Sequence, residues 1–259
     1  YGAAYSVTDY AAAGHITLAS AERILVDNSV AYFNLAGADN SQLGGTLSVR
    51  LDLENRGGDS TETDQFNTHL NRHAQLVVTG TDINTLPTGL SFGEDIEDIA
   101  TADTSVASSY LSSSQINQSG LGNLQLVVKD HQYKSSLSGQ TAAYSLRQGQ
   151  IVFGDGLDLV INGNLRLDAS EFLMPQENAA ASVTAHTLLV GSSEVNFNRI
   201  TPARYQDILE SDDTAVFDLR SPTHTTSLSL HADSIGLYGD FVVNDIAQLD
   251  IVSANDISL

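Results

Sequence analysis

The chain contains no cysteine and no tryptophan, and only two of its 259 residues are lysine, Lys129 and Lys134. Without cysteine it forms neither a disulfide framework nor a thiolate site, which suits a chain that must stay unfolded and uncrosslinked during export. No apolar run approaches the ~18 residues that a membrane-spanning helix needs. These absences exclude cysteine chemistry and a helical membrane anchor within this sequence.

Positive charge is also scarce. The chain has 11 basic and 32 acidic residues, which gives a formal net charge of −21. Nucleic acids and anionic membranes bind basic surfaces, so neither is expected as a direct partner. Hydrophobic residues make up 41% of the chain, which is enough for a continuous core.

The two ends of the sequence carry no targeting signal that we can identify. No charged segment followed by an apolar one begins at Tyr1, and the sequence stops on the alternating stretch "DISL". We therefore interpret the sequence as a piece of a longer protein or as a mature product, and draw nothing about its compartment from the missing signal.

Short apolar alternations recur along the chain. In the clearest pair, Leu228 and Leu230 are followed by Leu249 and Ile251 about 21 residues later. The word "ITLASAERILV", which starts at Ile16, aligns without gaps with "LDIVSANDISL" near the C-terminus. A shorter form starts at Leu76, a further copy at Leu165 and a weaker copy at Ala181. Alternation with a period of two residues is typical of strands, and strands repeated at a fixed interval indicate stacked coils.

The pattern therefore predicts an all-β fold, a right-handed parallel β-helix over residues 1–259, in which stacked coils bury one apolar column. A β-sandwich is the main alternative, but it predicts no self-similarity at 21 residues. Three polar, turn-rich or helix-forming stretches are expected to be insertions, near residues 54–73, 84–115 and 192–223.

Several phrases resemble the repeat region of filamentous-haemagglutinin-type exoproteins, which are large bacterial adhesins and contact-dependent toxins. The clearest are "SLSLHADSIGLYGDFVVNDIAQLDIVSANDISL", "GQIVFGDGLDLVINGNLRLDASEFLM" and "GGTLSVRLDL". The resemblance implies a β-helical stalk, secretion or display on the bacterial cell surface, and an adhesive function. It also implies an outer-membrane two-partner-secretion transporter as the partner during export. The asparagine-rich secretion domain of the family is not seen, and the acidic insertions here are long.

Acidic and histidine clusters are the first candidates for metal sites. Carboxylates crowded on a loop bind calcium. Two insertions hold such groups, Asp59, Glu62 and Asp64 in one and Glu94, Asp95, Glu97 and Asp98 in the other. Neither has EF-hand or nonapeptide calcium spacing, so we expect solvated acidic loops. His69 and His73 have the spacing of a zinc-protease motif, but Leu70 replaces its glutamate, and His224 and His231 are scattered.

A polysaccharide hydrolase or lyase built on the same fold is the main rival interpretation. Asp155, Asp158 and Asp168 lie near predicted strands, and Arg147 and Arg166 offer positive charge. The alternation with Leu157, Leu159 and Leu167 instead predicts that these aspartates point outward or lie in turns. The strongly negative chain also argues against a site for polyanionic sugars.

Aromatic side chains are sparse and give no clear sugar-binding platform. Phe153, Phe172 and Phe241 stand at inward positions and are expected to stack in the core, whereas Tyr5, Tyr10 and Tyr32 are undetermined. We assign no catalytic, cofactor-binding or metal-binding residue and expect a non-enzymatic structural and adhesive module. Its expected partners are a cell-surface protein or glycan receptor and flanking coils or copies stacked end to end. A self-assembling filament subunit is a further alternative.

Overall fold

The computed structural model describes most of the C-terminal half of the chain and shorter parts of the N-terminal half. The described residues are 13–20, 23–24, 34–37, 44–51, 73–82, 106–135, 143–193 and 225–259.

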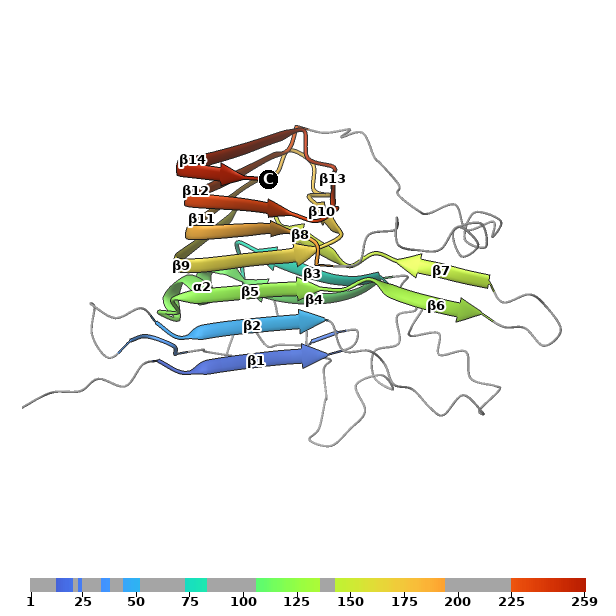
Figure 1. Cartoon of the computed structure of the whole chain (residues 1–259), viewed down its shortest axis with the longest axis horizontal. Coiled ribbons are helices and arrows are strands. Elements are labelled where there is room, and N and C mark those ends of the chain that lie inside the picture. Colours follow the sequence, from blue (N-terminus) through green and yellow to red (C-terminus); the bar gives the residue numbers. More distant parts are fainter. Residues whose placement is uncertain are drawn as a thin grey trace, which may run out of the picture.

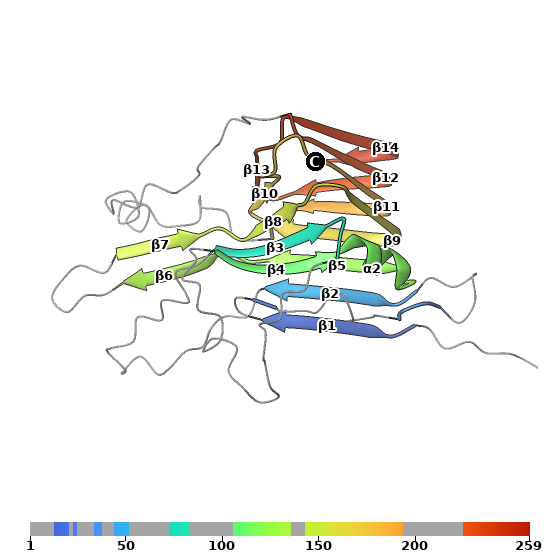
Figure 2. The same ribbon diagram turned by 180° about the vertical axis from the view of Figure 1, so that it is seen from behind.

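Two parallel sheets dominate these residues (Figure 1). The seven-stranded sheet contains, in spatial order, β1 (His15–Ser20), β2 (Thr46–Leu51), β5 (Asn123–Val128), β9 (Leu157–Ala169), β11 (Ala180–Gly191), β12 (Ser227–Tyr238) and β14 (Gln248–Ser258). The five-stranded sheet contains β13 (Val242–Asn244), β10 (Glu171–Leu173), β8 (Gln150–Phe153), β3 (His73–Thr79) and β4 (Val106–Ser112). An antiparallel hairpin, β6 (His131–Ser135) and β7 (Ala143–Arg147), projects away from both sheets (Figure 2).

The chain passes repeatedly from one sheet to the other. It runs from β8 to β9, returns to β10 and crosses again to β11, and it later moves from β12 through β13 to β14. Side chains of both sheets meet in one buried apolar cluster. The core therefore lies between the two sheets and extends along both of them.

Similar apolar side chains stack in columns across the seven-stranded sheet. One column takes a single residue from each strand, namely Ile16, Leu47, Leu124, Leu165, Leu188, Ile235 and Ile257. The four middle leucines of this column are fully buried. Since full burial of such a side chain contributes about 1.5–3 kcal/mol, each strand is fixed in register by the column that it joins.

The predicted right-handed parallel β-helix is wrong. The strands form two separate parallel sheets and do not close into one solenoid. A regular winding would place β4 between β3 and β8, because β4 follows β3 in the chain. Instead β3 pairs directly with β8, and β4 lies outside β3 at the edge of the sheet. Among the described residues, backbone hydrogen bonds join the strands of each sheet to one another, and the two sheets meet through side chains.

The predicted parallel pairing of strands about 21 residues apart near the C-terminus is confirmed. The predicted alignment of Ile16 with Leu249 is wrong. Leu230 lies opposite Ile251, and Leu228 lies opposite Leu249. Ile16, which we aligned with Leu249, belongs instead to the column that ends at Ile257. β1 therefore corresponds to the C-terminal half of β14, and no described residue before β1 forms a counterpart of the N-terminal half. The copy at Leu76 lies in β3 of the other sheet.

The predicted insertions fall largely outside the described residues. Residues 106–115 of the second one form β4 and the start of the short helix α2 (Ser113–Gln118). The Ser112 hydroxyl caps this helix by accepting a hydrogen bond from the Gln115 N–H. The side chain of Asn117 makes the hydrogen bonds that a neighbouring strand would make. It donates to the carbonyl of Asp158 and accepts from the N–H of Val160. α2 thereby covers the exposed edge of the N-terminal half of β9.

Candidate functional site

Among the described residues, the seven-stranded sheet has an open edge at β14, called the open end below. β14 is an edge strand, and among the described residues it hydrogen-bonds only to β12. Its apolar side chains are far more exposed than their partners: Ile257 is 49% exposed, whereas Ile235 beneath it is 2% exposed. Leu249 is also exposed, although its partner Leu228 is buried. This open end is an apolar surface with unpaired backbone groups, the features of a strand edge that accepts another strand.

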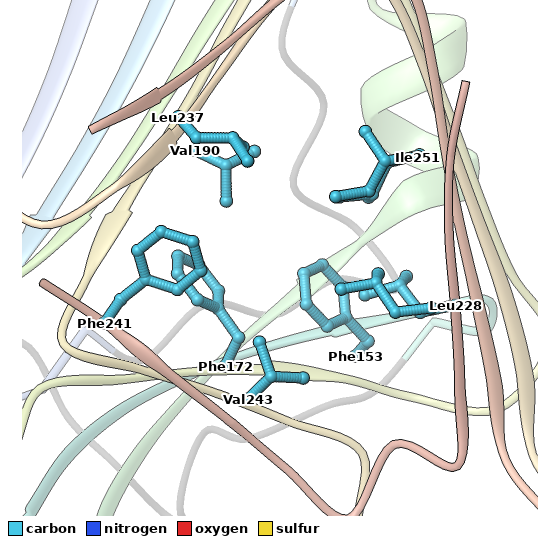
Figure 3. Close-up of a pocket in the computed structure, with 10 residues that line it drawn as sticks. Phe153, Phe172, Val190, Leu228, Leu237, Phe241, Val243 and Ile251 are labelled. Carbon is cyan, nitrogen blue, oxygen red and sulfur yellow. The ribbon is translucent and has the colours of Figure 1, made fainter. Parts of the chain in front are cut away.

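A cavity of about 180 Å³ lies within the core at this end (Figure 3). Leu237 and Val190 point into it from one side, Leu228 and Ile251 from another, and phenylalanines from a third. The residues that line it are all apolar. Such a cavity offers no polar group to orient a substrate, so it is a packing feature of an uncovered core.

Three phenylalanines form the aromatic wall of the cavity. Phe153 and Phe172 stack with ring centroids 6.3 Å apart, and Phe172 meets Phe241 edge to face at 5.4 Å. They come from β8, β10 and the residue that precedes β13, so the wall follows the five-stranded sheet. The prediction that these rings stack in the core is confirmed.

A polar ladder crosses the outer face of the five-stranded sheet. Ser108 donates to Gln75, Gln75 to Gln150, and Gln150 to Glu171, the last at 2.6 Å. Asn244 donates to the second carboxylate oxygen of Glu171, also at 2.6 Å. Gln150, Glu171 and Asn244 are buried. This ladder pins the register of four strand pairs, and sequence reasoning missed it because alternation alone places these residues in solvent.

A second polar cluster surrounds Asp130, just after β5. One carboxylate oxygen accepts from the Gly149 N–H and the other from the Ser170 hydroxyl, both at 2.8 Å. Ser170 in turn lies 3.2 Å from the Ser192 hydroxyl. Burial raises the pKa of Asp130 from 3.8 to about 6, against the opposing effect of these hydrogen bonds.

The raised pKa makes Asp130 a pH-dependent cost to stability. The folded state holds its proton up to about pH 6, whereas the unfolded chain loses it near 3.8. The contribution of Asp130 to stability therefore falls as pH rises from about 4 to about 6, and stays low above that. We expect Asp130→Asn to raise the free energy of unfolding at neutral pH by about 2 kcal/mol and to flatten this part of the pH profile.

Denaturant titrations at a series of pH values measure this effect. Asp158→Asn, at an exposed carboxylate on β9, is the matched control and should leave the profile unchanged. An Asp130→Asn protein that is less stable than the parent at neutral pH would show that the network requires the charged carboxylate.

The residues of the rival enzyme interpretation do not converge. Asp155 lies in a turn, where it accepts from the Ala180 N–H. Asp158 is exposed and accepts from Ser182. Asp168 stands ten residues further along the same strand, β9, where it is buried and accepts from the Ser193 N–H at 2.7 Å.

Arg166 pairs with Asp168 and spans the sheet to Tyr238. Its guanidinium donates to the Asp168 carboxylate and, at 3.2 Å, to the Tyr238 hydroxyl, and it lies 5.7 Å from the centre of that ring. Burial raises the pKa of Tyr238, although the hydrogen bond from Arg166 opposes this. The group ties β9 to β12 across β11, which is a structural role.

The remaining predicted candidates lie mostly outside the described residues. These are Asp59, Glu62, Asp64, His69, Glu94, Asp95, Glu97, Asp98, His224, Tyr5, Tyr10 and Tyr32. His73 begins β3, Arg147 ends β7, and His231 is exposed on β12. Within the described part of the chain, no group of three or more histidine or acidic side chains is arranged to hold a metal ion. No helix there is long and apolar enough to cross a membrane.

Comparisons with known proteins give no relative. No protein-family model matches the chain, and neither a curated protein nor a solved structure matches it.

Proposed function

We propose that the chain is a structural and adhesive module of a secreted or surface-displayed bacterial exoprotein. In this proposal the stacked strands act as a stiff spacer, and the segments that leave the sheets present the recognition surface to a cell-surface protein or glycan. Export would use an outer-membrane two-partner-secretion transporter. The secretion and adhesion parts of the proposal rest on the resemblance of the repeat phrases to filamentous-haemagglutinin-type proteins.

The observation that carries the spacer role is the seven-residue column across the larger sheet. Each strand contributes one apolar side chain to it, from Ile16 at one edge to Ile257 at the other. A sheet built on such a column can be lengthened by further strands without a change in its cross-section. Packing between neighbouring strands makes it stiff. The polar ladder through Gln150 and Glu171 supports the same role, because it fixes the second sheet in register.

Beads coated with the purified chain test adhesion directly. We expect them to bind cultured host cells, and the soluble chain should compete for this binding. Beads coated with heat-denatured chain are the control. Incubation with polysaccharides should release no new reducing ends. Binding no better than the control would count against the adhesive role, and released reducing ends would favour the polysaccharide-active alternative.

A further inference from the structure

The two edges of the seven-stranded sheet are complementary. β1 and β14 are its edge strands, and all seven strands run in the same direction. A β1 strand placed beside β14 would therefore continue the sheet in the sense in which it is already built. Neither edge has a second strand partner among the described residues.

The apolar column ends at both edges of the sheet with a side chain that is only partly buried. Ile257 is half exposed at one end, and Ile16 is only partly buried at the other, while the column residues between them are buried. Leu259 is 99% exposed beyond β14, and Leu18 is partly buried in β1. The local sequences are alike as well: Ile16-Thr17-Leu18 matches Ile257-Ser258-Leu259.

Another strand edge in this structure, that of the N-terminal half of β9, is covered and does not pair with a strand. The N-terminal half of β9 ends its part of the sheet, and α2 covers it through the two hydrogen bonds of Asn117. β14 has no such cover among the described residues, and the 180 Å³ cavity lies in the core beneath it.

We propose that a second copy of this chain covers the open end, with its β1 paired in parallel to the C-terminal half of β14. The register continues the column, so Ile257 faces Ile16 of the next copy and Asp256 faces its His15. This contact is head to tail and does not close, so copies add one after another. The inference concerns assembly and does not depend on the adhesive function proposed above.

Charge and hydrogen bonding fit this register. Asp256 and His15 are both exposed and form a complementary pair when the imidazole is protonated. Thr46 donates to the carbonyl of Gly14, and N–H groups point alternately to the two sides of a strand, so the Thr17 N–H faces the open side of β1. In the assembly this N–H donates to the Ile257 carbonyl. The net charge of −21 opposes association, so contact should strengthen as salt screens it.

Sedimentation equilibrium of the full chain at high ionic strength measures the assembly. We expect the average mass to rise with concentration above the 27.5 kDa of one copy and to pass that of two. Ile257→Asp places a charge at the contact and should weaken association at least about tenfold. Val252→Asp adds the same charge to the exposed outer face of the same strand and should have no effect.

A second pair of variants tests the other edge. Thr17→Pro removes the outward N–H while it leaves the hydrogen bonds to β2 intact, and Thr17→Val removes only the hydroxyl. We expect the Thr17→Pro protein to be monomeric when it is studied by itself. The Thr17→Val protein should assemble like the parent chain. Circular dichroism verifies that each variant folds.

Mixing the two blocked variants tests the polarity of the contact. Ile257→Asp keeps a free β1, and Thr17→Pro keeps a free β14. An equimolar mixture should therefore form dimers and nothing larger. Three results would overturn the proposal: a parent chain that is monomeric at all concentrations, a parent that stops at two copies, or dimers formed by either blocked variant alone.

Discussion

Replacing Phe172 by alanine is expected to lower the free energy of unfolding by about 3–5 kcal/mol. Phe172 is 2% exposed and contacts both Phe153 and Phe241, so its loss leaves a void at the centre of the aromatic wall. The void would join the 180 Å³ cavity that Phe172 already lines, which limits the ability of the core to collapse around it.

Denaturant unfolding followed by circular dichroism measures this loss. Val160→Ala is the control, because Val160 is 43% exposed on the outer face of β9, and its change should stay within about 0.5 kcal/mol. If Phe172→Ala cost no more than Val160→Ala, the two sheets would not share the core described here.

Replacing Gly191 by alanine is expected to have a comparably large effect, about 3 kcal/mol or more. Gly191 ends β11 beside the end of β12, and a Cβ there would lie 1.9 Å from the carbonyl oxygen of Tyr238. That oxygen accepts a hydrogen bond from the Ser192 N–H at 3.1 Å, so moving it away breaks the pairing of the two strands at this point.

Gly14→Ala provides the matched control for this substitution. A Cβ at Gly14 would meet no atom within 4 Å, so the midpoint of unfolding should be unchanged or slightly raised. Equal effects of the two substitutions would mean that β11 and β12 do not approach as closely at Gly191 as the structure places them.

The parallel pairing was predictable because its signal is local. Alternation in "SLSLHAD" and "QLDIVSAND" marks one face of each strand, and the matching interval places Leu230 opposite Ile251. The same alternation put Phe153, Phe172 and Phe241 in the core. Inward-facing apolar residues need only period-two sterics and burial, both of which can be read from a few residues.

The arrangement of strands into two sheets was not predictable in the same way. Both β3 and β4 carry apolar alternation, and nothing in either strand shows that β3 will pair with β8. That choice depends on contacts more than 70 residues apart in the chain, such as Gln75 with Gln150. The position of β1 was misjudged because "ITLAS" fits both halves of β14 equally well as a hydrophobic pattern.

The buried polar ladder was also beyond sequence reasoning. Glu171 and Gln150 alternate with core residues, a pattern that alone places them on the solvent side, yet both are buried and hydrogen-bonded to each other. End-to-end stacking of copies stays a prediction. The residues that would make the contact, Ile257 and Ile16, emerge only from the seven-strand column.

Parallel, in-register pairing of the long strands is the central claim, and cysteine pairs test it most directly because the chain has no cysteine of its own. Thr184 and His231 are exposed partners on β11 and β12. Strands lie about 4.8 Å apart, which is within the Cα separation that a disulfide spans. Thr184→Cys with His231→Cys should therefore oxidise readily within one chain, whereas Thr184→Cys with Ser229→Cys, shifted by two residues, should not. Efficient oxidation of the shifted pair, with none in the first, would contradict the register on which this account rests.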